Sequence, residues 1–109
     1  MSVLTRILNA LFLTTARLFV VAWIGGAASC APLEHYNVLE AALANDFVTA
    51  RIHMDKLLPL LRNMESGGYT QKVKVGCALR GIPVGNPRQP LLPLSAEDRA
   101  EFEKIFKNL

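Results

Sequence analysis

Three lysines could supply an amine nucleophile, but their sequence context predicts ordinary surface positions. A nucleophilic lysine must be desolvated, so that its pKa falls and the neutral amine forms. Lys72 and Lys74 flank Val73, which we place on the buried face of a helix, and Lys56 precedes a leucine pair on another helix. Because lysine is rarely buried, we expect all three ammonium groups to face water.

The tyrosines and histidines also lack a catalytic spacing. Tyr36 and Tyr69 are predicted to be packing residues or loop anchors. His35 and His53 stand far apart in the sequence and form no catalytic triad or metal-binding pattern. We therefore expect them at the surface or at helix ends rather than in acid–base catalysis.

The two cysteines, Cys30 and Cys77, are not part of a CxxC motif or a histidine-spaced metal pattern. A disulfide between them would require a secreted context, and the burial preference of cysteine favours two buried thiols. The pair Gly67–Gly68 is predicted to form a turn, not a dinucleotide-binding motif. No phosphate loop, paired-carboxylate motif or zinc signature is present, so the sequence predicts no metal and no cofactor.

The composition is that of a globular protein: 51% of the 109 residues are hydrophobic, 19% are charged, and no repeat is visible. This length allows one domain at most, or a piece of one. The net charge of +3 is spread along the chain without a Lys/Arg run. We therefore expect no nucleic-acid partner.

From residue 32 onward the apolar spacing is helical. Pro32 suits a first helical turn, Asp46 and Ser95 suit N-caps, Gly81 suits a helix end, and Pro59 predicts a kink within one helix. The predicted helices span about 33–44, 46–64, 70–80 and 96–108.

Apolar residues at spacings of three and four predict the buried face of each helix. In chain order these faces are Tyr36, Leu39, Ala42 and Leu43; Phe47, Ala50, Met54, Leu57, Leu58 and Leu61; Val73, Cys77 and Ala78; and Phe102, Ile105, Phe106 and Leu109.

Residues 81–95 contain four prolines and two glycines, which exclude a long helix or a central strand. The same segment carries several Ile, Val and Leu residues that need burial. We predict that it lies extended across an already folded surface, with its apolar side chains facing that surface. We call residues 81–95 the strap.

Two interpretations fit the N-terminal part. Residues 2–13 have helical spacing and residues 18–24 form a β-branched and aromatic run, which together suggest a helix followed by a buried strand. Alternatively, Arg6, an apolar run and small residues before Cys30 resemble a secretory signal. Against this, Arg17 divides the apolar run into pieces shorter than the roughly 18 residues that a spanning helix needs.

Three stretches, in order, resemble the C-terminal end of the dihydrodipicolinate synthase / N-acetylneuraminate lyase family. They are residues 68–74 (GYTQKVK), 79–85 (LRGIPVG) and 87–95 (PRQPLLPLS), and a weaker likeness extends back to about Trp23. The resemblance implies a (β/α)8 barrel with extra C-terminal helices, of which a complete copy needs about 250 residues. The expected fold class is therefore mainly α: a C-terminal fragment of a TIM barrel, with one possible strand at 18–24.

The resemblance also implies a division of the chain and one site residue. Residues 1–31 would be the last α/β unit of the barrel, or alternatively a targeting segment, and residues 32–109 the C-terminal helical region. Ile24 would place its backbone beside the pyruvate pocket, although Ala22 and Gly25 depart from the family's glycine and serine. From the residues alone, Ile24 is simply a core strand residue.

The resemblance implies a pyruvate-dependent aldolase or dehydratase that acts through a Schiff base. The family's lysine, its proton-shuttling tyrosine and its carboxylate-binding loop precede the part resembled here, so no catalytic residue is transferred. We expect an inactive, cytoplasmic C-terminal part that self-associates or docks on a full-length homologue. In that case pyruvate or a related oxo acid binds only to the complete enzyme, and membrane association is not expected. The alternative is a small exported or membrane-anchored helical protein without enzymatic activity, whose residues 1–30 are the targeting segment.

Overall fold

The computed structural model describes residues 24–109, and this part of the chain is helical, with no strand. Its elements are a short 3-10 helix η1 (Gly26–Ser29) and the helices α2 (Pro32–Leu43), α3 (Phe47–Glu65), α4 (Tyr69–Leu79) and α5 (Ala96–Lys107). The expectation of a mainly α fold is confirmed for these residues, and every helix end lies within one residue of the predicted range. The predicted helix at 2–13 and nearly all of the predicted strand at 18–24 lie outside the described residues.

The helix ends form where local chemistry predicts them. The backbone N–H of Thr49 donates to Asp46 Oδ1 at 3.1 Å, and that of Asp98 donates to Ser95 Oγ at 3.2 Å. Both contacts satisfy an N–H group that the first turn of a helix leaves without a partner. After α4, Gly81 adopts a φ of 83°, a left-handed conformation that ends the helix.

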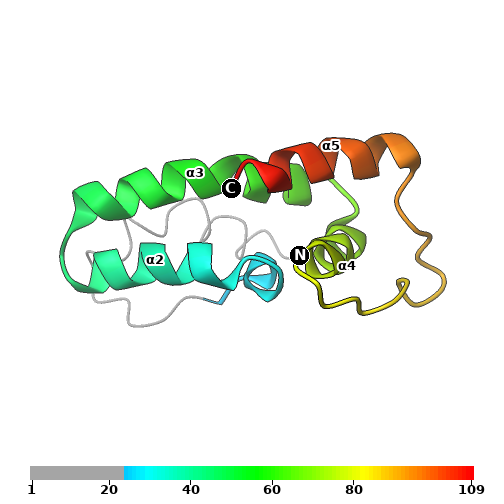
Figure 1. Cartoon of the computed structure of the whole chain (residues 1–109), viewed down its shortest axis with the longest axis horizontal. Helices are drawn as coiled ribbons and strands as arrows, with labels where there is room; N and C mark the ends of the chain where they lie inside the picture. The colour runs from blue at the N-terminus through cyan, green and yellow to red at the C-terminus, as the bar shows by residue number, and fades with distance from the viewer. Residues whose placement is uncertain (1–23) are drawn as a thin grey trace.

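Helices α2 and α3 lie side by side as an antiparallel hairpin, and α5 lies along the C-terminal end of α3 (Figure 1). Helix α4 packs against α3, α5 and η1. Pro59 lies inside α3, and the helix continues through it. The strap loops away from the helices between α4 and α5 (Figure 1).

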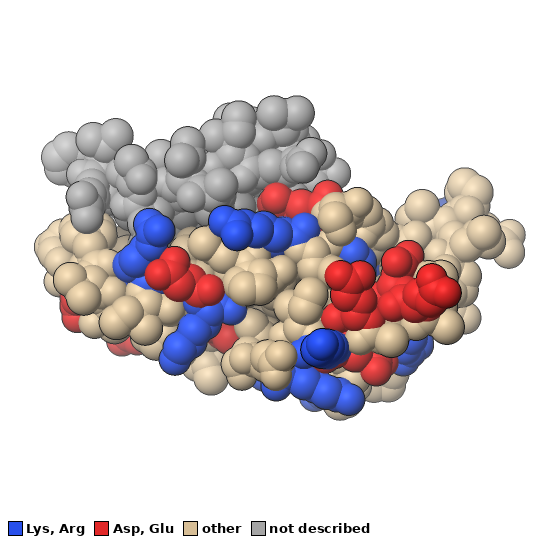
Figure 2. Space-filling view, turned by 90° about the horizontal axis from the view of Figure 1, so that it is seen from above, with Lys and Arg blue, Asp and Glu red and all other residues tan. Residues whose placement is uncertain are grey.

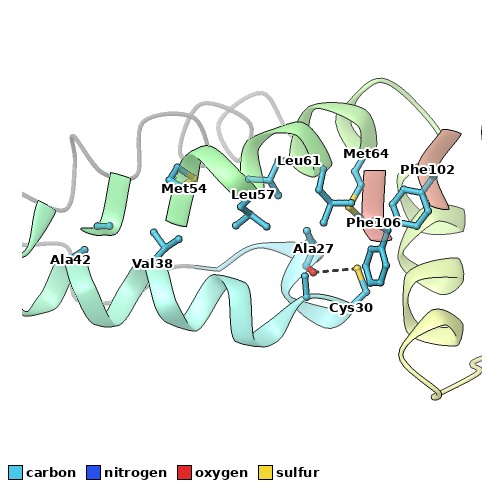
Figure 3. Packing of buried hydrophobic residues seen from close by; sticks show 13 residues of the cluster. Ala27, Cys30, Val38, Ala42, Met54, Leu57, Leu61, Met64, Phe102 and Phe106 are labelled. Atoms are coloured by element: carbon cyan, nitrogen blue, oxygen red, sulfur yellow. Dashed lines mark hydrogen bonds between the residues drawn. The ribbon is translucent and has the colours of Figure 1, made fainter. Parts of the chain in front are cut away.

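The core is one continuous layer between α3 and the elements that face it (Figure 3). Val38 and Ala42 of α2 face Met54 and Leu57 of α3 in the hairpin. At the other end of α3, the core closes around η1 and α5 with Ala27, Cys30, Ala31, Leu60, Leu61, Met64, Phe102 and Phe106. The predicted faces of α3 and α5 are therefore confirmed in the main.

The predicted face of α2 was right for Ala42, which is buried, and for Leu39, which packs against the core, but wrong for Tyr36 and Leu43. The buried residues are His35, Val38 and Ala42, whereas Tyr36 and Leu43 remain 56% and 54% exposed.

Helix α4 also presents a different face to the core from the one predicted. Its buried residues are Lys72 and Gly76, while Val73 and Cys77 are half-buried and Ala78 is exposed. The contact at Gly76 is a backbone approach, which a pattern of apolar side chains does not reveal.

The described helices do not provide the folded surface that was predicted to lie under the strap. Ile82, Val84, Leu91 and Leu92 are 66%, 48%, 45% and 75% exposed. Only Pro87 and Leu94 are partly buried in this segment. Gln71 fixes one point of the strap, because its Nε2 donates to the carbonyl oxygen of Leu92 at 3.0 Å.

Lys72 is buried, so the expectation that it faces water was wrong. Its Nζ donates to the carbonyl oxygen of Asn63 at 2.6 Å and lies 3.4 Å from Ser66 Oγ. Asn63 stands in the last turn of α3, where carbonyl groups lack helical partners and the helix dipole favours a cation. Lys72 therefore ties the end of α3 to α4.

Gly76→Ala is expected to destabilise the fold. A Cβ at this position would lie 2.7 Å from Cys30 Cβ and 3.3 Å from a ring carbon of Phe106. Overpacking typically costs about 1–3 kcal/mol, which should exceed the gain of about 1 kcal/mol in helix propensity. Urea unfolding followed by circular dichroism measures the difference, with the exposed Thr70→Ala on the same helix as control. A more stable Gly76→Ala variant would contradict the close contact.

Lys72→Met should lower the free energy of unfolding by about 1.5–3 kcal/mol, because the stem still packs but the charged donor to Asn63 is lost. Lys56→Met is the matched control, since Lys56 is exposed on α3, and its effect should stay within about 0.5 kcal/mol. The urea midpoints of the two variants give the comparison. Equal midpoints would show that the ammonium of Lys72 contributes nothing to the fold.

Candidate functional site

The candidate site is the segment from Ile24 to Ala31, which contains the one site residue, Ile24, that the family resemblance predicts. Ile24 is 90% exposed and lies directly before η1, outside any strand. The next turn is packed inward, since Ala27, Cys30 and Ala31 are all buried. The expectation that Ile24 is a core residue was wrong for the described part of the chain. The side chains of residues 24–109 bury Ala27 of η1 but leave Ile24 exposed.

Tyr69, the first residue of α4, fixes the start of η1. A Cβ at Gly26 would lie 2.7 Å from Tyr69 Cε1 and 2.8 Å from its hydroxyl oxygen. Burial raises the pKa of the Tyr69 hydroxyl, so this group is neutral over the physiological range. Tyr69 is thus a packing residue, as predicted, and only glycine leaves it room at position 26.

The two cysteines border the same segment and both are free. Cys30 is buried and its thiol donates to the carbonyl oxygen of Ala27 at 3.4 Å. Burial raises the pKa of the Cys30 thiol to about 11, and the nearby Cys77 adds to this effect. Cys77 is half-buried on α4, and its Sγ lies 3.5 Å from the carbonyl oxygen of Ser29. The prediction of two buried thiols is therefore confirmed for Cys30 and only partly for Cys77.

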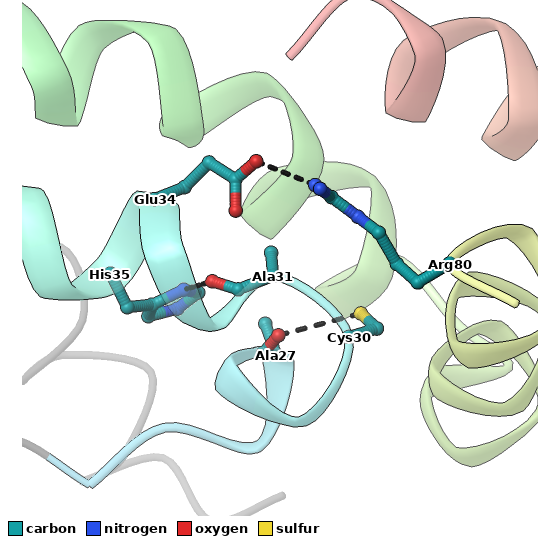
Figure 4. Close-up of polar contacts among 6 residues, drawn as sticks. All are labelled: Ala27, Cys30, Ala31, Glu34, His35 and Arg80. Atoms are coloured by element: carbon teal, nitrogen blue, oxygen red, sulfur yellow. Dashed lines mark hydrogen bonds and ion pairs between the residues drawn. The ribbon is translucent and has the colours of Figure 1, made fainter. Parts of the chain in front are cut away.

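Polar contacts hold the beginning of α2 in place (Figure 4). His35 is buried rather than at the surface, and its Nδ1 lies 2.7 Å from the carbonyl oxygen of Ala31. Burial lowers the pKa of the His35 imidazole. Arg80, just after α4, pairs with Glu34 and lies 4.9 Å above the ring of Phe106. Arg80 thereby connects α2, α4 and α5 around the site.

The described cavities lie away from Ile24. One of about 230 Å³ lies between α4, the strap and α5, with Gln71, Lys74, Asn86 and Arg99 as its polar lining. Another of about 190 Å³ lies between α2 and α3, and its lining includes Glu34, His53 and Lys56. Neither cavity includes a residue of the 24–31 segment.

The lysines of residues 24–109 do not converge on the candidate site. Lys72 is used at the end of α3, the Nζ of Lys74 donates to the carbonyl oxygen of Val84 at 3.4 Å, and Lys56 is exposed. In the same range, no three His, Cys, Asp or Glu side chains gather as metal ligands would. The described helices are also each too short or too polar to span a bilayer.

Sequence reasoning missed the residues that shape this region, namely Gly76, Arg80 and Glu34. An isolated glycine within a helical pattern does indicate a close backbone approach, and Gly76 carried that signal. The pairing of Arg80 with Glu34 joins two distant segments, and nothing local in the sequence indicates it.

Comparisons with known proteins agree with this geometry. The model of the dihydrodipicolinate synthetase family matches residues 8–109. The 4-hydroxy-tetrahydrodipicolinate synthase 1 of Halalkalibacterium halodurans is 43% identical over 54 residues, which are 50% of this chain and 18% of that protein.

Two solved structures have the same fold over nearly the whole chain. The crystal structure of a putative dihydrodipicolinate synthetase from Pseudomonas aeruginosa superposes with a TM-score of 0.83 and 27% identity, covering 92% of this chain and 34% of that one. Proteus mirabilis N-acetylneuraminate lyase gives a TM-score of 0.77 and 27% identity, with coverages of 91% and 34%. The chain thus spans about a third of these solved proteins and corresponds to a helical part of their fold. By the match of its sequence and the agreement of its helices, the chain belongs to the dihydrodipicolinate synthetase family.

Proposed function

We propose that these 109 residues are the C-terminal part of a Schiff-base lyase that acts on pyruvate-derived oxo acids, and that they are inactive alone. The observation that carries the proposal is the combination of family membership with coverage of only 34% of the solved relatives. On this proposal residues 1–31 belong to the last α/β unit of the barrel and residues 32–109 form the helical region that follows.

The placement of the lysines supports inactivity. Schiff-base formation needs a neutral amine in a desolvated pocket next to the bound carbonyl. Lys72, which is the buried lysine of the described part, is bound to the Asn63 carbonyl, and Lys56 and Lys74 lie away from the 24–31 segment. In the complete enzyme, Ile24 would contribute only its backbone beside the pyruvate pocket.

The exposed apolar surface supports a missing partner. Leu92 is 75% exposed in the strap, Ile24 is 90% exposed before η1, and Val48 is 75% exposed on α3. The strap itself carries four exposed large apolar side chains, Ile82, Val84, Leu91 and Leu92, and such a concentration on one segment is typical of an interaction site. We propose that the strap docks on the remaining two-thirds of a family barrel, supplied by a homologous chain.

The surface charge does not point to another class of partner. On the face shown in Figure 2, Lys and Arg side chains are interrupted by Asp and Glu side chains, and no continuous basic surface forms. A cytoplasmic location remains a prediction from the family resemblance.

Borohydride trapping tests the proposed inactivity. The purified chain is incubated with pyruvate and sodium borohydride, and its intact mass is measured. We expect no change, because Lys72 is bound to the Asn63 carbonyl and the cavities lined by Lys56 and Lys74 lie away from the 24–31 segment, whereas a full-length family enzyme treated in parallel should gain one reduced adduct. An adduct on any lysine of the chain would show that it forms the imine unaided.

Coexpression tests the proposed docking. The tagged chain is coexpressed with the first two-thirds of the Pseudomonas aeruginosa relative, and the copurified amount is measured. Leu92→Asp should reduce copurification at least about tenfold, because docking would bury an unpaired charge. Gln89→Asp is the matched control, since it places the same charge on an exposed polar position of the strap. Equal copurification of both variants, or no association of the unsubstituted chain, would refute the docking surface.

A further inference from the structure

Cys30 and Cys77 are far apart in the sequence but adjacent in the fold. The Sγ of Cys77 lies 3.5 Å from the carbonyl oxygen of Ser29, the residue directly before Cys30. A Cβ on Gly76, the residue directly before Cys77, would lie 2.7 Å from Cys30 Cβ and 2.9 Å from Cys30 Sγ. Each cysteine therefore touches the chain neighbour of the other.

This proximity is close enough for a covalent link. Consecutive Cα atoms are about 3.8 Å apart, so contact with Gly76 leaves Cys30 only one residue from Cys77. A disulfide needs Cβ atoms about 3.8 Å apart, which a small shift of the backbone of η1 against α4 can provide, and rotation of the half-buried Cys77 side chain about χ1 then turns its Sγ toward Cys30. The chain has no other cysteine that could compete.

From this juxtaposition we propose that Cys30 and Cys77 are a thiol modification site, at which a low-molecular-weight disulfide reacts with Cys77 and Cys30 then closes an intramolecular disulfide. The bond would join the end of η1 covalently to α4. The inference does not depend on the proposed lyase function, because neither thiol has a role in it.

The two thiols differ in solvent exposure, as the proposed order of steps requires. Cys77 is half-buried, and its contact with Ser29 lies at the exposed side of the helix. Cys30 is 1% exposed and faces Gly76 and Phe106, so a bulky reagent cannot reach it directly. Cys77 is thus the entry thiol and Cys30 the resolving thiol.

The chemistry balances with oxidised glutathione as the oxidant. The Cys77 thiolate attacks one sulfur of glutathione disulfide, forms a mixed disulfide and releases one glutathione thiolate. The Cys30 thiolate then attacks the Cys77 sulfur and releases the second glutathione thiolate. The protein loses two electrons and two protons, and one glutathione disulfide becomes two glutathione molecules.

The burial of Cys30 makes the second step slow at neutral pH. Burial first, and then Cys77 and Glu34, raise the pKa of the Cys30 thiol to about 11, while Arg80 opposes them. Tyr69 is the other titratable group that interacts with Cys30. Since only the thiolate attacks, closure should accelerate about tenfold per pH unit between pH 7 and 10.

The test incubates the full chain with oxidised glutathione, blocks free thiols with N-ethylmaleimide and measures the intact mass. We expect a product about 2 Da lighter than the reduced chain, with no maleimide and with a Cys30–Cys77 peptide link. Two blocked thiols, or disulfides only between chains, would overturn the proposal. So would a closure rate that does not rise with pH.

Single variants check the order of the steps. Cys30→Ser, and Cys30→Ala in case the buried hydroxyl impairs folding, should accumulate a stable glutathione adduct on Cys77. Cys77→Ser should remain unmodified under the same conditions, because Cys30 is shielded. A rapid adduct on Cys30 in the folded Cys77→Ser chain would overturn the assignment of Cys77 as the entry thiol.

Discussion

The packing of the described chain depends on one backbone contact, the approach of Cys30 and Phe106 to Gly76 on α4. Glycine in a helix interior is less favourable than alanine by about 1 kcal/mol, so its presence there has to be offset by packing. Here the missing side chain lets η1 and α5 meet on one face of α4, and all three elements share a continuous core. Arg80, one turn later, reaches Glu34 on α2 and the ring of Phe106 from the same edge.

The core around α3 is well packed, but several large apolar side chains elsewhere on the described helices and the strap are exposed. Buried aliphatic and aromatic side chains fill the space between α3 and its neighbours, as Figure 3 shows. In contrast, apolar side chains on the strap, at Ile24 and on the outer face of α2 remain in water. Burying a large apolar side chain stabilises a fold by about 1.5–3 kcal/mol, so covering these exposed positions with a further surface would add to the stability of the fold.

The sequence predicted what depends on local chemistry. The N-caps at Asp46 and Ser95 and the left-handed residue at Gly81 use side chains and dihedral angles within a few residues, and helix limits therefore follow directly. Helix faces were predicted well where one strong apolar stripe exists, as in α3 and α5. They were wrong for Tyr36 and Leu43 of α2, because an apolar residue such as Tyr36 can face a partner as well as the chain's own core, and the pattern does not distinguish the two.

Tertiary contacts explain the remaining errors and limit what the candidate site can do. Lys72 is buried because its ammonium donates to the Asn63 carbonyl in the last turn of α3, which also accepts from Ser66, and His35 because its imidazole folds back onto the Ala31 carbonyl. Both polar groups are buried by tertiary contacts, and average burial preferences of residue types do not predict such contacts. The same contacts use those side chains structurally, and Ile24 stands exposed one turn away from the packed η1. From Ala27 onward the described helices therefore pack on one another, whereas the exposed apolar positions, which include Ile24 and the strap residues Ile82 and Leu92, lie outside this core.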